Sequence, residues 1–179
     1  MTKSIIALLV SFIALSAQAA DKTETLWEIS GGANANYTHT SSNSLSTHSF
    51  GILGQAAYEF APQWEAALDL NFTSSTDSAS NTTSSWNILV GPVYNFMADH
   101  VNSVFLEALV GLHINSPSSG SSTTVFAYQA GLGKRFGLAS NIAYKPEFTF
   151  GGTTKSSGTP VVASSTTWAI IPLQFSIML

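Results

Sequence analysis

Few residues of this 179-residue chain could do chemistry. Charged residues make up 9% of the sequence, against about 25% in a soluble domain. Eight of them share one setting, because each lies on the polar side of a stretch in which apolar and polar residues alternate. These eight are Glu28, Glu59, Glu65, Asp69, Glu107, Arg135, Lys145 and Glu147. If they face one enclosed space, they must form ion pairs or be hydrated, since an isolated buried charge is costly.

These eight charged residues are compatible with two functions. Six carboxylates and two cations cannot all pair one to one, so the remaining acids must meet water or take up protons. A set that only fills an interior conducts nothing, whereas the same set around a continuous water path forms a narrow, cation-preferring pore. We favour the filled polar interior and keep the pore as the alternative.

A nucleophile assembled from connecting segments is a third reading. His39 and His48 flank one such segment, and Asp77 with Ser78 lies in another. A histidine near a serine and an acid can activate a nucleophile, and this placement resembles that of palmitoyltransferase-like outer membrane barrels. However, 27 serines and 18 threonines make a chance match nearly certain. The amphipathic N-terminal helix of that family also has no room before Trp27, so we expect no enzyme.

The sequence also contains no pattern typical of a metal, cofactor or nucleic-acid site. The chain has no cysteine, and no paired-ligand spacing points to a metal. The glycines at 131, 133 and 137 miss the dinucleotide fingerprint. Six Lys and Arg against ten Asp and Glu provide no basic cluster for nucleic acid. We therefore expect no cofactor and no nucleic-acid partner.

The N-terminus has the three parts of a secretory signal peptide. Lys3 provides the positive charge, residues 5–15 are apolar except for Ser11, and residues 17–19 read Ala-Gln-Ala. The apolar stretch is too short to span a bilayer as a helix. We expect a signal peptide over 1–19 and a mature domain over 20–179.

Strict alternation of apolar and polar residues recurs eight times in the mature chain. In one run Trp64, Ala66, Leu68, Leu70 and Phe72 alternate with polar residues. Each run has roughly 11 residues, the length a tilted strand needs to cross a bilayer. In the last run the predicted apolar face holds Ala169, Ile171, Leu173, Phe175, Ile177 and Leu179.

The lengths of the connections and the positions of the aromatic residues indicate that these strands form a transmembrane barrel. Residues 38–48, 73–85, 115–124 and 151–166 form long, hydroxyl-rich connections, whereas 61–63, 97–102 and 137–141 are short. Aromatic residues gather at both ends of the runs, as in the two girdles of transmembrane barrels. We assign Trp27, Tyr37, Phe50, Tyr58, Trp64, Phe72, Trp86, Tyr94, Phe136 and Phe150 to these girdles. A soluble β-barrel would also alternate, but it needs neither girdles nor strands of this length.

The predicted fold is therefore all-β: an eight-stranded antiparallel up-and-down transmembrane β-barrel. An even strand number places both termini on the short-turn side, which we expect to be periplasmic, with the four long connections extracellular. An eight-stranded barrel has an interior that side chains fill, which excludes a wide porin.

Two stretches carry a family resemblance. Residues 131–148 read GLGKRFGLASNIAYKPEF, and the chain ends on Phe175, Ile177 and Leu179 with alternate spacing. The chain resembles the small OmpA/OmpX-like outer membrane β-barrels. This resemblance implies an integral outer membrane protein of a Gram-negative bacterium, with lipids and lipopolysaccharide around it. It also implies periplasmic chaperones, insertion by the barrel-assembly machinery and a structural or surface-interaction role, with a ligand at the loops as one option. Leu179 departs from the aromatic residue usual at the last position.

Overall fold

The computed structural model describes residues 27–40, 45–155 and 164–179. The predicted signal peptide, 1–19, lies outside these residues. The strands are β1 (Trp27–Thr40), β2 (Leu45–Ala61), β3 (Trp64–Asp77), β4 (Thr82–Asn95), β5 (Val104–Pro117), β6 (Thr123–Lys134), β7 (Phe136–Ala139), β8 (Ile142–Tyr144), β9 (Glu147–Thr153), β10 (Ser165–Ile171) and β11 (Gln174–Met178). A short 3-10 helix, η1 (His100–Asn102), precedes β5. No helix in the described part of the chain is long and apolar enough to cross a membrane.

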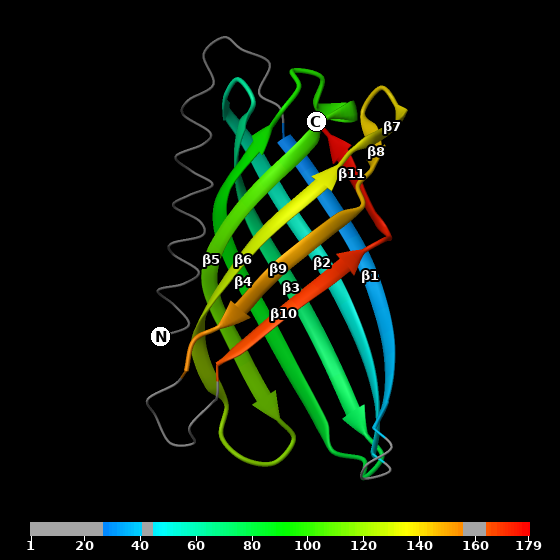
Figure 1. Ribbon diagram of the computed structural model, residues 1–179, viewed down its shortest axis with the longest axis vertical. Coiled ribbons are helices and arrows are strands. Elements are labelled where there is room, and N and C mark those ends of the chain that lie inside the picture. The colour runs from blue at the N-terminus through cyan, green and yellow to red at the C-terminus, as the bar shows by residue number, and fades with distance from the viewer. Residues whose placement is uncertain (1–26, 41–44, 156–163) are drawn as a thin grey trace.

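All neighbouring strands run antiparallel in one sheet, in the order β10-β9-β6-β5-β4-β3-β2-β1-β11-β8-β7. The sheet curls into a barrel because β11, near the end of the chain, pairs with β1 at its start. At this closure, the backbone N–H groups of Trp27 and Leu179 each donate to the other's carbonyl oxygen, at 3.0 and 2.7 Å. Figure 1 shows the tight turns and the C-terminus at one end, the short-turn end, and the longer hairpins at the other, the hairpin end.

The prediction of eight uninterrupted strands is wrong in detail, because the described sheet has eleven strand segments. Three of the predicted runs are interrupted: one at Arg135, one at Lys145–Pro146 and one at Pro172–Leu173. A proline has no N–H to donate to a ladder, which accounts for the second and third breaks. At the first, the Arg135 N–H donates instead to the Ser103 carbonyl, at 2.8 Å.

The predicted long connections are also shorter than expected. The strands continue into the hydroxyl-rich segments, so that β3 and β4 remain paired as far as Thr76 and Thr82, and β4 and β5 as far as Thr83 and Pro117. Threonine favours extended backbone because its branched Cβ fits a pleated surface. In the two connections that are described throughout, 73–85 and 115–124, most hydroxyl-rich residues therefore extend paired strands rather than long irregular loops.

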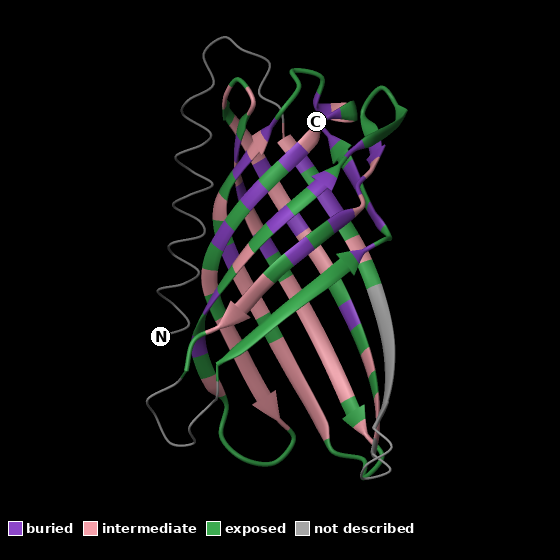
Figure 2. Cartoon of the chain, viewed as in Figure 1, coloured by how far each residue is buried: buried purple, intermediate pink, exposed green. Residues whose placement is uncertain are grey.

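Side chains alternate between an enclosed interior and an exposed outer surface, as the stripes in Figure 2 show. In β5, Phe105, Glu107 and Leu109 are at most 1% exposed, whereas Leu106 and Val110 are each 48% exposed. A small apolar cluster forms part of the interior: Ala57, Ala67, Leu89, Val93, Phe105, Leu109 and Ala127. Large apolar residues thus cover the outside while charged and small side chains fill the inside.

The predicted face of the last run is wrong before its break. Ile171 is buried, whereas Trp168 and Ile170 are exposed. The break at Pro172–Leu173 inserts one extra residue, which exchanges the two faces of a strand whose period is two. Beyond the break, Phe175, Ile177 and Leu179 lie on the exposed face.

The same break leaves a gap in the ladder at the hairpin end. β10 lies at one edge of the sheet and pairs with β9, while β11 accompanies β1 only as far as Gly32. Among the described strands, β1 beyond Gly32 therefore has a neighbour only on the β2 side. We call this gap between β10 and residues 33–40 of β1 the seam.

Candidate functional site

The predicted charged residues gather in the barrel interior, and Arg135 is central to them. The alternation of β6 continues through Arg135 and directs its side chain inward, where it is 0% exposed. One guanidinium nitrogen donates to Glu28, and also to Oε2 of Glu65 at 3.1 Å. The other donates to Oδ1 of Asn95. Arg135 thus links β1, β3 and β4 across the short-turn end.

Lys145 comes from the second break and reaches the same carboxylate from another side. Its Nζ lies 3.0 Å from Oε1 of Glu28 and donates to Oε1 of Gln55 at 2.5 Å. Arg135 and Lys145 both lie over the Phe105 ring, 4.8 and 4.7 Å from its centre. Glu28 therefore accepts both cations, and all these groups are shielded from solvent.

His100 contacts the same group of charged residues from a segment outside the strands. It lies on η1, and its Nδ1 is 3.0 Å from Oε1 of Glu65. Its Nε2 is 3.6 Å from Oε1 of Glu59. The hydrogen bond to Glu65 is the main cause that raises the pKa of His100. We call Glu28, Glu59, Glu65, Asn95, His100, Arg135 and Lys145 the mouth cluster.

The remaining carboxylates form a second set without a cation. Glu107 accepts hydrogen bonds from Gln55 and Gln129, each at 2.9 Å. Asp69 and Glu147 each retain one buried oxygen without a hydrogen-bond partner. The ion pairs found in the described residues leave all three acids without a basic partner. We call Asp69, Glu107 and Glu147 the acidic layer.

Gly131 leaves room for this layer. A Cβ at Gly131 would meet Glu147 Oε1 and, at 2.6 Å, Glu107 Cγ. Two carboxylates therefore pack over a position where only a hydrogen fits.

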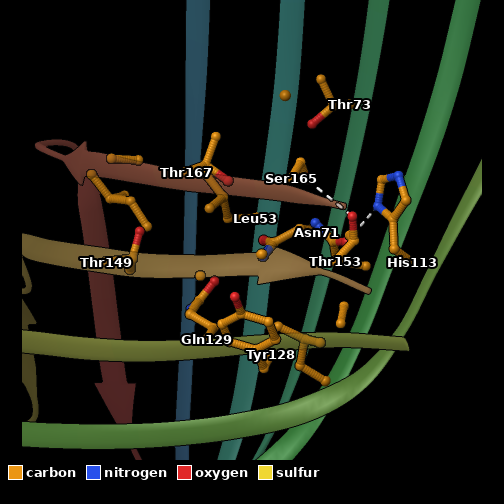
Figure 3. A pocket seen from close by; sticks show the side chains of 18 of the residues that line it. Leu53, Asn71, Thr73, His113, Tyr128, Gln129, Thr149, Thr153, Ser165 and Thr167 are labelled. Atoms are coloured by element: carbon orange, nitrogen blue, oxygen red, sulfur yellow. Dashed lines mark hydrogen bonds between the residues drawn. The ribbon is translucent and has the colours of Figure 1, made fainter. Parts of the chain in front are cut away.

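A cavity of about 270 Å³ occupies the hairpin half of the interior. Its polar lining includes Asn71, Gln129, Thr149, Thr153 and Thr167, which Figure 3 shows around one space. Nδ1 of His113 lies 2.7 Å from Oδ1 of Asn87 at its edge. Gln129 joins the cavity to the acidic layer, because its amide also binds Glu107.

Among the described residues of the enzyme reading, Asp77 is engaged in its own hairpin and His48 lies on the opposite face. Asp77 caps its own hairpin, where its Oδ1 accepts from the N–H groups of Ala79 and Asn81, each at 2.9 Å. His48 pairs with Thr76, which precedes Asp77, so alternation puts His48 and Asp77 on opposite faces. Ser78 lies in the exposed turn beyond β3. The side chain of His39 lies outside the described residues.

The predicted girdle residues lie near both ends of the outer surface. At the short-turn end Trp27 contacts Tyr58, Trp64 contacts Tyr94 and Phe136 contacts Tyr144, with ring centres 5.0, 4.9 and 6.0 Å apart. Towards the hairpin end Phe72 contacts Trp86 at 4.8 Å, and Phe50 and Phe150 are exposed. The side chain of Tyr37 lies outside the described residues.

Sequence reasoning missed three members of the interior network. Gln55 and Asn95 lie on the polar faces of two predicted strands, so alternation placed them inward without predicting their partners. His100 lies in a predicted short turn. No pattern in the sequence indicated that this turn folds back over Glu65.

Comparison with solved structures identifies the architecture. The Neisserial surface protein A structure aligns with a TM-score of 0.60 and 15% identity, covering 86% of this chain and 95% of that one. The Yersinia pestis attachment invasion locus protein Ail, solved with the heparin analogue sucrose octasulfate, aligns at 0.54 and 17%, covering 88% and 100%. At these identities the likeness shows the fold alone. A search of curated proteins found no significant match.

A comparison with sequence-family models identifies the family as well as the fold. The model of the outer membrane protein beta-barrel domain matches residues 5–167. That range includes most of the strands, and it confirms the resemblance to small outer membrane barrels. The chain therefore belongs to the outer membrane protein β-barrel domain family, whose members are integral to the outer membrane of Gram-negative bacteria.

Proposed function

We propose that this protein is a non-enzymatic surface barrel with a structural or interaction role, which displays four hydroxyl-rich hairpins outside the cell. The observation that carries the proposal is the inverted distribution of side chains. Arg135, Lys145 and Glu28 are buried inside, whereas Phe148, Leu132 and Val110 are exposed outside. A soluble barrel would place these groups the other way round.

The barrel crosses the membrane eight times in this proposal. β6 with β7, β8 with β9, and β10 with β11 each count as one interrupted crossing, because one or two residues separate the members of each pair. With five unbroken strands this makes an even number, so both ends of the barrel lie on one side. We assign the short-turn end to the periplasm and the hairpins to the outside.

The hairpins support a role in contacts with neutral partners. Hydroxyl groups bind each other across them, as in Thr76–Thr82, Ser116–Ser122 and Thr153–Ser165 at 2.9–3.1 Å. Lys155 is the one Lys or Arg in the four connections expected to be long. A sulfated ligand such as the one bound to Ail would meet little positive charge here, so we expect surface ligands of another class.

The filled interior is favoured over the cation-preferring pore by the mouth cluster. Arg135, Lys145 and Glu28 are almost fully buried where a water path would have to pass. Planar-bilayer recording distinguishes the two readings. We expect no discrete conductance, whereas a cation-preferring conductance weakened by Glu107→Gln or Glu147→Gln would establish the pore.

Partners follow from the membrane location. We propose that outer membrane lipids and lipopolysaccharide surround the exposed belt. Periplasmic chaperones and the barrel-assembly machinery deliver the chain, with Phe175, Ile177 and Leu179 as the assembly signal. The exposed positions of these three residues along β11 and at its end support this role.

Membrane location and orientation can be tested together. We expect the protein to remain in washed outer membranes and to change gel mobility on boiling. A peptide tag inserted at Gly120 should be detected on intact cells, and the same tag inserted after Ser140 only after the outer membrane is opened. Surface detection of the Ser140 tag alone would reverse the orientation. A lipid A mass change that depends on the protein and disappears with Ser78→Ala would overturn the non-enzymatic assignment.

A further inference from the structure

The seam carries an inference that the proposed function does not include. β10 has a ladder neighbour on the β9 side, and its residues 165–170 are exposed on both faces of the strand. Figure 2 shows β10 as exposed along almost its whole length. The break at Pro172–Leu173 separates this strand from β11, so the ladder of described strands is continuous at the short-turn end and interrupted between β10 and β1 at the hairpin end.

The seam lies within the apolar outer surface. Trp168 and Ile170 are 71% and 65% exposed, and they pair in register with Phe150 and Phe148. Phe150 belongs to the hairpin-side girdle, which marks the level of lipid head groups. Where the seam extends below this level, its backbone edges would face lipid tails, and each unpaired polar group there costs several kcal/mol. Water or polar lipid groups that reach these edges would remove that cost.

The cavity lies behind β10, the strand at one side of the seam. Ser165, Thr167 and Trp168 of β10 line it together with Thr149 and Thr153 of β9. Figure 3 shows Thr167 and Ser165 facing the same space as Thr149 and Thr153. Ser165 and Thr167 line the cavity and are nevertheless exposed, so the cavity is accessible from outside along β10.

The lining chemistry indicates what could occupy this space. Within the described residues, the cavity is lined by amides, hydroxyls, His113 and Tyr128 together with apolar groups, and by no Asp, Glu, Lys or Arg. Amides and hydroxyls both donate and accept, as sugar hydroxyls do. The acidic layer lies next to it through Gln129, and its carboxylates disfavour an anionic head group.

We propose that the seam admits the neutral, hydroxyl-rich head group of a membrane amphiphile into the cavity, while its hydrocarbon chain remains outside against Trp168 and Ile170. Hydroxyl groups then meet the strand edges and the amides of Asn71 and Gln129. The inference adds a lipid-facing site to the proposed surface role. It depends on the proposed orientation only for the leaflet that supplies the amphiphile.

Photolabelling in vesicles tests this site. The full-length mature protein is reconstituted in phosphatidylcholine vesicles with dodecyl glucoside that carries a photoreactive group on the sugar. Labelled residues are then mapped by mass spectrometry. We expect saturable labelling of cavity residues such as Thr149 and Thr153, undiminished by excess free glucose. Dodecyl phosphate, with the same chain and an anionic head group, should not compete.

Adjacent threonines provide a matched pair of variants. Thr167 lines the cavity, whereas Thr166 precedes it on the opposite, outward face of β10. Thr167→Trp should reduce cavity labelling at least about tenfold, because the indole would fill the space that the head group needs. A tenfold change corresponds to about 1.4 kcal/mol of binding free energy. Thr166→Trp should leave it unchanged. Both variants are first checked for heat-dependent gel mobility.

Three results would overturn the proposal. Labels confined to the outer girdle would show that the head group does not enter. Cavity labels removed by free glucose would show a solution ligand that enters from the hairpin end. Cavity labels equally strong in folded Thr167→Trp would place the ligand elsewhere. Because the first two results need only the wild-type protein, a variant that fails to fold does not affect them. The photoreactive amphiphile is present in both leaflets of the vesicle, so it reaches the site whichever way the barrel is inserted. A reversed barrel would therefore not produce any of these three results.

Discussion

Nδ1 of His100 lies 3.0 Å from Oε1 of Glu65, so a residue of the turn before β5 reaches a carboxylate of β3 inside the barrel mouth. The contact joins segments 35 residues apart in the sequence. It also places the one titratable imidazole of the mouth cluster against an acid that already binds Arg135. The mouth is therefore closed by a contact that responds to pH.

The stability of the barrel should fall as pH rises through the titration of His100. Its pKa is raised above the usual 6.5, mainly by the hydrogen bond to Glu65 and also by Glu59, against burial and Arg135. A raised folded-state pKa means that the stabilisation is complete below pH 6.5 and is lost as pH rises through the folded value. Urea unfolding in vesicles at a series of pH values measures it.

His100→Gln should remove this part of the pH dependence. His48→Gln, at the other end of the barrel, should keep it. A wild-type midpoint that stays constant or increases over the same range would contradict the role given to His100.

Loss of the Arg135 side chain should destabilise the barrel strongly. Arg135→Ala leaves Glu28 and Glu65 buried without this guanidinium, and breaking a buried pair costs roughly 3–5 kcal/mol. The adjacent Lys134→Ala is the matched control, because Lys134 is exposed and its Nζ lies 4.8 Å from the Phe136 ring centre. Its loss should cost roughly 0.5–1 kcal/mol. Equal unfolding free energies for the two variants would refute the ion-paired mouth.

Two buried glutamates should differ in how much stability the same substitution costs. Glu28 accepts both Arg135 and Lys145, so Glu28→Gln should cost roughly 3–5 kcal/mol. Glu147 has no basic partner in the ion pairs of the described residues and has one buried oxygen without a hydrogen-bond partner. Glu147→Gln should leave the unfolding free energy unchanged or raise it, because it removes an unpaired buried acid. Comparable losses in urea titrations would show that the acidic layer has a cation partner in solution.

Leu179→Phe should increase the yield of assembled barrel. Leu179 ends the closing strand, bonds to Trp27 through its backbone and exposes its side chain on the outer surface. An aromatic ring there would join the interfacial belt. The measurement is the fraction of protein that shows heat-dependent gel mobility after synthesis with the assembly machinery present. An unchanged or lower fraction than wild type would remove the role assigned to the terminal residue.

Much of this architecture could be predicted from short-range pattern alone. Alternation requires only that neighbouring residues of an extended chain face opposite sides. That rule placed Leu106 and Val110 outside and Glu107 inside before any contact was known. It failed for Ile171, because a bulge after that residue exchanges the faces and only pairing with the neighbouring strands determines where a bulge occurs.

The sequence by itself determined the β class, the membrane-facing belt and the set of inward charges, because these follow from period and composition. Only the tertiary structure decided which charges meet. Glu28 binds Arg135, 107 residues away, and Glu147 binds neither cation, although the sequence presents both as inward acids. The seam is likewise a property of the tertiary structure, since it depends on where the pairing between β11 and β1 ends. Partner choice between distant strands depends on register and closure, which no local pattern contains.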